Sequence, residues 1–63
     1  MSSGELVPGA IIRSKHARTR RRLLEIIGHG EDRRWLVETL GTYPTVYTIH
    51  AEVIEQEWVV EHE

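Results

Sequence analysis

The apolar side chains of this chain come in short runs that glycine and proline interrupt, and this pattern constrains the fold more than any other feature. The runs are four to eight residues long and are rich in Ile, Val, Trp, Tyr and Thr. Runs of this length and composition are typical of β-strands. We therefore predict strands over residues 10–14, 20–27, 33–40, 46–49 and 57–61.

Turn-forming residues separate these predicted strands. Pro8-Gly9 precedes the first strand, residues 28–32 hold two glycines, and residues 41–45 contain Gly41 and Pro44. Proline presets φ and glycine permits positive φ, so these segments favour tight turns. Residues 51–56 place Val53 and Ile54 among Glu and Gln, which predicts one α-helical or 3₁₀ turn before the last strand.

Residues 20–27 permit a second interpretation. Leu23, Leu24, Ile26 and Ile27 sit at i, i+1, i+3 and i+4, a spacing typical of a helix. A helix pair over residues 15–40 therefore remains an alternative. We favour a β-hairpin, because five turn-like residues connect two runs of eight residues and the second run carries Trp, Val and Thr.

The size of the chain limits it to one domain. A chain of 63 residues buries only about 60% of its unfolded surface and is too small for two layers. We expect an all-β fold, a small five-stranded barrel over residues 6–61, with a disordered lead at residues 1–5 and a frayed end at 62–63. There is no Cys, which excludes disulfides and thiolate metal sites. No apolar stretch approaches a membrane span of about 20 residues, and no signal-peptide pattern is present, so we expect a cytoplasmic protein.

The basic residues are concentrated at one place in the sequence. Six of the eight lie within ten positions: Arg13, Lys15, Arg18, Arg20, Arg21 and Arg22. This cluster runs directly into an apolar run, which indicates that it belongs to a folded element. Lys and Arg neutralise phosphates and release counterions. We therefore predict that these six residues bind nucleic acid, DNA or RNA; strand alternation sends Arg20 and Arg22 to one face and Arg21 to the other.

The layout resembles SH3-like barrels, in which the last strand follows a short 3₁₀ turn. More particularly, it resembles small hypothetical proteins of actinobacterial phages. The residues that carry the resemblance are Pro8-Gly9, Ile11-Ile12-Arg13, Arg20-Arg21-Arg22-Leu23, Ile49 with Val53-Ile54, and Trp58. The resemblance implies a phage-encoded, non-enzymatic module that binds nucleic acid or a protein segment in the host cytoplasm. It also implies that the first and last strands lie side by side, so Arg13 and Lys15 can alternatively pair with Glu57 and Glu61, at about 0–1 kcal/mol each.

A protein partner is the second predicted function. The chain has adjacent apolar residues such as Leu23-Leu24 and Ile26-Ile27, and in a strand such neighbours point to opposite faces, so one residue of each pair is expected on the outside. Exposed apolar patches usually mark interfaces. Acidic residues also surround Trp58 near the end of the chain. A host protein, for example transcription machinery, or a second copy would fit such a surface. The residues predicted for it are Leu23, Ile27, Trp35, Glu55, Glu57 and Trp58.

Catalysis has little support in the sequence. The four histidines show no metal-ligand spacing, and His50 with Glu52 is a chance-level pairing. Gly28-His29-Gly30 falls short of a phosphate-binding loop. We predict no catalytic residue, no metal, no cofactor and no small-molecule substrate.

Overall fold

The computed structural model describes residues 6–61, and these form five strands, one short α-helix and one 3₁₀ turn. The elements are β1 (Ile11–Ser14), β2 (Arg20–Ile27), η1 (Gly30–Asp32), β3 (Arg34–Thr39), β4 (Val46–His50), α1 (Ala51–Glu57) and β5 (Trp58–Val60). The predicted all-β class, the five strands and the helical turn before the last strand are confirmed. The helix-pair alternative is wrong, because residues 20–27 are a strand. The predicted disordered lead at residues 1–5 and frayed end at 62–63 lie outside the described residues.

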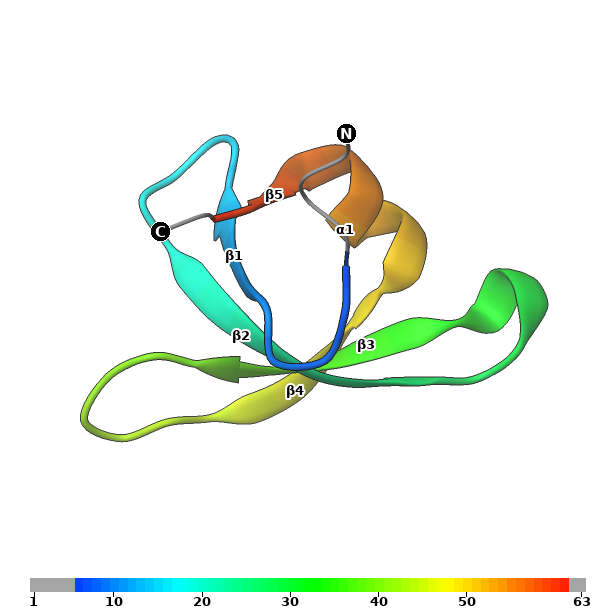
Figure 1. The fold of residues 1–63 in the computed structure, drawn as a ribbon, viewed down its shortest axis with the longest axis horizontal. Coiled ribbons are helices and arrows are strands. Elements are labelled where there is room, and N and C mark those ends of the chain that lie inside the picture. Colours follow the sequence, from blue (N-terminus) through cyan, green and yellow to red (C-terminus); the bar gives the residue numbers. More distant parts are fainter. Residues whose placement is uncertain (1–5, 62–63) are drawn as a thin grey trace.

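All five strands belong to one antiparallel sheet of order β4-β3-β2-β1-β5. The long strand β2 pairs with β1 through its first residues and with β3 along most of its length. As Figure 1 shows, β1, β5 and α1 fold over the β2–β3–β4 part of the sheet. Within residues 6–61, β4 and β5 remain edges that do not pair with each other, so the sheet is open. Closure into a barrel is therefore not confirmed.

The core lies between the inner face of the sheet and α1. Its fully or nearly fully buried side chains are Ile12, Leu23, Trp35, Val37, Ala51 and Ile54. Partly buried side chains of Leu6, Ala10, Ile49, Trp58 and Val60 pack against them. A core this small supplies only about 3–5 kcal/mol of net stability without disulfides or metals.

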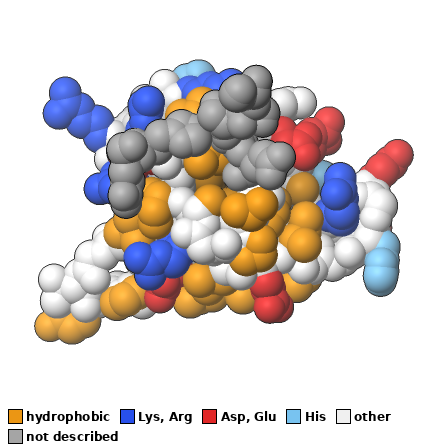
Figure 2. Space-filling view, in the orientation of Figure 1, with side chains coloured by type: hydrophobic (Ala, Val, Ile, Leu, Met, Phe, Trp, Pro, Cys, Tyr) orange, Lys and Arg blue, Asp and Glu red, His pale blue; other side chains and the backbone are white. Residues whose placement is uncertain are grey.

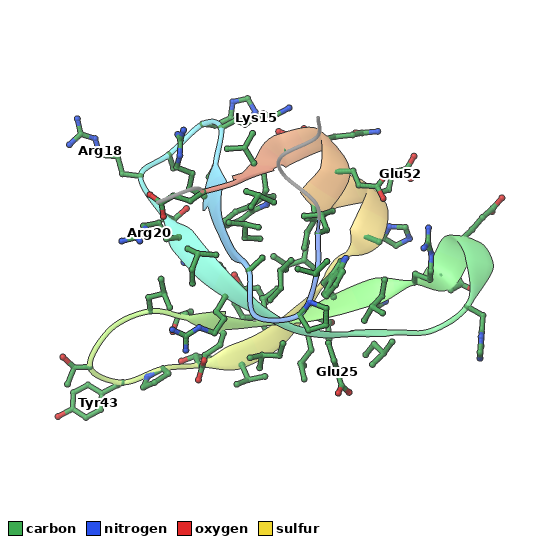
Figure 3. The ribbon with its side chains drawn as sticks, viewed as in Figure 1. Lys15, Arg18, Arg20, Glu25, Tyr43 and Glu52 are labelled. Carbon is green, nitrogen blue, oxygen red and sulfur yellow. The ribbon has the colours of Figure 1, made fainter. Side chains whose placement is uncertain are left out.

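A β-bulge at Leu24 decides which side chains of β2 enter this core. Leu23 pairs with Val37, but Glu25 pairs with Leu36, so Leu24 is an extra residue in β2. Strict alternation would place Glu25 on the same face as the buried Leu23. The bulge moves Glu25 to the outer face, where it points away from the core (Figure 3), and keeps its carboxylate in water.

Candidate functional site

Five of the six predicted nucleic-acid-binding residues share one exposed surface. Arg13 lies directly opposite Arg20 on the paired strands β1 and β2, and Arg22 follows Arg20 on the same outer face. Lys15 and Arg18 lie on the connection between the two strands. Figure 3 shows Lys15, Arg18 and Arg20 pointing away from the core. In the same orientation, Figure 2 shows basic side chains gathered at the upper left of the molecule. We call this surface the cationic patch; it consists of Arg13, Lys15, Arg18, Arg20 and Arg22.

The connection between β1 and β2 is fixed by hydrogen bonds at its base. The Ser14 N–H donates to the Thr19 carbonyl at 3.0 Å, and the His16 N–H donates to Ser14 Oγ at 3.0 Å. The Lys15 N–H donates to the Glu57 carbonyl at 2.9 Å, which ties the connection to the end of α1. His16 Nε2 also pairs with the Glu57 carboxylate. The predicted pairing of Lys15 with Glu57 is thus a backbone contact, and the side chain that meets the Glu57 carboxylate is His16.

Carboxylates neutralise only part of the cationic patch. Arg20 Nε lies 2.8 Å from Glu61 Oε1, and Arg22 Nη1 lies 3.6 Å from Glu38 Oε1. Exposed pairs of this kind contribute about 0–1 kcal/mol each. Among the residues that the structure describes, Arg13, Lys15 and Arg18 have no carboxylate within 4 Å. Like charges directly opposite each other on paired strands are unfavourable, so Arg13 beside Arg20 is a local excess of charge.

Arg21 does not belong to the cationic patch. It lies opposite the buried Ile12, which places it on the inner face at the open end of the core. Its Nε donates to the Tyr47 hydroxyl at 2.7 Å, and its guanidinium carbon lies 5.8 Å from the Tyr47 ring centre and 5.9 Å from that of Trp58. Tyr47 comes from edge strand β4 and Trp58 from edge strand β5. Arg21 therefore spans the gap between the two edges of the open sheet, on the face opposite Arg20 and Arg22 as strand alternation predicts, and it does not share the surface of the other five predicted residues.

The six residues predicted for a protein partner do not form one surface. Leu23 is fully buried and Trp35 is 4% exposed, so both belong to the core and their prediction as surface contacts was wrong. Each points inward because it pairs with an inward neighbour, Val37 or Ile49, along the same face of the sheet. The other four are spread over different elements. They are Ile27 on the outer face of β2, Glu55 and Glu57 on α1, and the half-buried Trp58.

Four acidic residues lie away from the cationic patch, around an open groove between η1 and α1. Its lining includes Glu31, Asp32, Glu52 and Glu55, together with Arg33; Figure 3 shows Glu52 on the opposite side of the view from Arg18 and Arg20. No group of three or more His, Asp or Glu suited to a metal ion occurs within residues 6–61. The groove therefore offers negative charge without a ligand cage.

His50 connects the two sides of this groove, a role the sequence analysis missed. Its Nδ1 accepts from the Glu52 N–H at 3.2 Å and so caps α1. With Nδ1 as acceptor, Nε2 of a neutral ring carries the proton and donates to the Glu31 carbonyl at 2.8 Å. The sequence signal for this role was weak, namely a polar residue directly before a predicted helical turn.

Comparisons with protein-family models, curated proteins and solved structures find no match to the chain. No helix among the described residues is long and apolar enough to cross a membrane.

Proposed function

We propose that this chain is a non-enzymatic nucleic-acid-binding module that holds a phosphate backbone with the cationic patch. The observation that carries the proposal is the opposition of Arg13 and Arg20 beside Lys15 and Arg18, three of these four having no carboxylate partner among the described residues. Unbound, this arrangement is electrostatically unfavourable. Phosphates would relieve the repulsion and release counterions, which gives affinity without sequence preference.

The rigid support of the patch favours the same proposal. Arg13, Arg20 and Arg22 are held on paired strands, and the connecting segment is tied to α1 through Lys15 and Glu57. Side chains on such a framework lose less freedom when they meet a ligand than those on a mobile tail. The proposal includes an SH3-like arrangement, supported by the adjacency of β1 and β5 and by α1 preceding the last strand. A phage source and action in the host cytoplasm remain part of the proposal.

Titration of labelled oligonucleotides against salt tests the proposal. Fluorescence anisotropy with single-stranded DNA, duplex DNA and RNA is measured upward from about 50 mM salt. If all five residues of the patch contact phosphates, log K against log salt has a slope of about −4.5 for duplex DNA and about −3.5 for a single strand. Absence of binding to all three probes at micromolar protein would refute the proposal.

A matched pair of variants locates the binding surface. Arg13→Gln removes a cation of the patch, and Arg34→Gln removes another exposed cation, one that lies outside the patch and beside η1. We expect Arg13→Gln to reduce the magnitude of the slope by about 0.9 on duplex DNA and Arg34→Gln to leave it unchanged. Equal losses in both variants would show that net charge, and not this patch, governs binding.

The alternative proposal is an accessory module that binds a host protein. Of its six predicted residues, Leu23 and Trp35 are buried and Trp58 is half-buried, which leaves Ile27 on β2 and Glu55 and Glu57 on α1 as the more exposed ones. It is therefore less well supported than the cationic patch. A pull-down from nuclease-treated host lysate separates the two proposals, because a single stoichiometric protein would favour the alternative.

A further inference from the structure

Strand β4 is an edge of the sheet with unpaired backbone groups. Within residues 6–61 it pairs with β3 alone. The bonds from the Thr39 N–H to the Thr45 C=O and from the Ala51 N–H to the Arg33 C=O show which residue pairs of this ladder are hydrogen-bonded. In an antiparallel ladder, hydrogen-bonded and non-hydrogen-bonded pairs alternate. Tyr47 and Ile49 therefore direct their backbone groups towards β3. Val46 and Thr48 direct both their N–H and C=O groups to the free edge, and His50 directs its N–H there; the His50 C=O, at the N-cap of α1, accepts the first bond of the helix.

This edge lacks the features that usually prevent strands from pairing with another chain. Edge strands are commonly protected by charged side chains, proline, bulges or short length. In β4 the five residues include no Lys, Arg, Asp, Glu or Pro, and its register with β3 shows no bulge. The other edge, β5, has only three residues. β4 is thus the edge better suited to pairing.

Exposed apolar side chains continue from β4 into the hairpin tip. Val46 is 50% exposed and Tyr43, at the tip, is 89% exposed, and Leu40 and Tyr47 are also exposed. Figure 3 shows Tyr43 projecting into solvent at the end of the β3–β4 hairpin. The free backbone groups therefore lie beside an apolar surface that nothing in the described chain covers.

We propose that a second copy of this chain pairs with β4, antiparallel, with Thr48 on the two-fold axis. Thr48 of each copy would exchange N–H···O=C bonds with the other, and Val46 would lie opposite His50 of the second copy. On the inner face, Tyr47 would lie opposite Ile49 of the second copy, an aromatic–β-branched pair of the kind that stabilises sheets. This inference is independent of the proposed nucleic-acid binding.

The side chains that would meet across the axis carry no like charges, which agrees with a second copy as the occupant. Glu38 is the β3 neighbour of Val46, and Arg34 is the β3 neighbour of His50. In the proposed register, Glu38 of one copy and Arg34 of the other fall on the same row of the joined sheet. These two side chains stand three strand spacings apart, about 14 Å, so they form no ion pair, but no like charges face each other between the two β4 strands.

Sedimentation equilibrium tests the dimer, from about 10 μM to about 1 mM, a range suited to a small interface. We expect concentration-dependent dimerisation of the unmodified chain. Thr48→Lys and Thr48→Glu each place like charges opposite each other at the axis, and we expect each to weaken self-association at least tenfold. An equimolar mixture of the two should restore a dimer, because Lys then faces Glu.

The control variant is Ala17→Lys, which adds the same charge on the exposed β1–β2 connection and should leave dimerisation unchanged. Thr48→Pro gives an independent check, since it removes an outward N–H and no bond to β3. Circular dichroism establishes that each variant is folded. A monomer throughout the range for the unmodified chain, or unchanged dimerisation of folded Thr48→Lys, would overturn the proposal.

Discussion

Replacement of Arg21 by Met tests whether this arginine stabilises the fold, in contrast to the arginines of the cationic patch, which we propose bind the ligand. Met keeps most of the aliphatic stem but removes the bond from Nε to the Tyr47 hydroxyl and the contacts with the Tyr47 and Trp58 rings. A hydrogen bond of this kind contributes about 0.5–1.5 kcal/mol net. Each partly exposed cation–π contact adds at most about 0.5–1 kcal/mol, and less near the 6 Å limit. We expect Arg21→Met to lower the free energy of unfolding by about 1–2 kcal/mol.

Thermal unfolding and a double-mutant cycle measure this loss. In a domain of this size, 1 kcal/mol shifts Tm by about 4–8 °C, so the expected fall is about 5–15 °C. Tyr47→Phe removes only the hydroxyl, and its coupling with Arg21→Met should be about 0.5–1.5 kcal/mol. Arg13→Gln is the matched control, because Arg13 is exposed and has no carboxylate partner among the described residues. We expect its stability to stay the same or to rise by up to about 1 kcal/mol, since it relieves repulsion with Arg20.

Salt dependence of oligonucleotide binding completes the comparison. Arg13→Gln should reduce the slope on duplex DNA by about 0.9, while Arg21→Met should leave it within about 0.3 of the unmodified value. The reasoning is refuted if Arg21→Met reduces the slope as much as Arg13→Gln and leaves Tm unchanged. That result would mean that the Arg21 guanidinium meets the ligand instead of Tyr47 and Trp58.

Two further predictions concern the scaffold. Gly28 has φ +92, and an added Cβ would lie 2.6 Å from the Asp32 carbonyl oxygen, so we expect Gly28→Ala to lower the free energy of unfolding in chemical denaturation by about 2–4 kcal/mol. Gly30 has φ +56 with no atom within 4 Å of an added Cβ, so Gly30→Ala should lower it by about 1 kcal/mol. Equal losses in the two variants would contradict the steric argument. Ile54 is fully buried, so Ile54→Ala should cost about 2–5 kcal/mol and leave the chain largely unfolded by circular dichroism at 25 °C. Val53→Ala, on the exposed side of α1, should stay within about 0.5 kcal/mol, and a large loss there would contradict the assigned core.

Local sequence chemistry placed the five strands and the helical turn to within one residue at each end, but it did not predict η1 and left a helix open over residues 20–27. The predicted strand at residues 20–27 has the observed bounds, because a glycine follows its last β-branched residue and ends the ladder. The helical turn before β5 was also predicted, since Val53 and Ile54 lie among good helix formers. The clustering of cations on β1, β2 and their connection followed from the sequence as well. In each case the determining residues are neighbours in the chain.

Only the tertiary structure decided which side chains face inward. The bulge at Leu24 reverses the alternation of β2, so that Glu25 faces water while Leu23 fills the core. The sequence of residues 20–27 does not predict that bulge, because the bulge depends on how β2 pairs with β3. Strand alternation alone separates Arg21 from Arg20 and Arg22, but its contacts have a tertiary origin, since its partners Tyr47 and Trp58 come from the two edge strands.

The chain alone therefore determined the strands and the place where positive charge concentrates, because both depend on residues adjacent in sequence. Contacts between strands decided the open sheet, the buried positions of Leu23 and Trp35 and the partners of Arg21. Such contacts depend on register, and a shift of one residue would exchange the two faces of a strand.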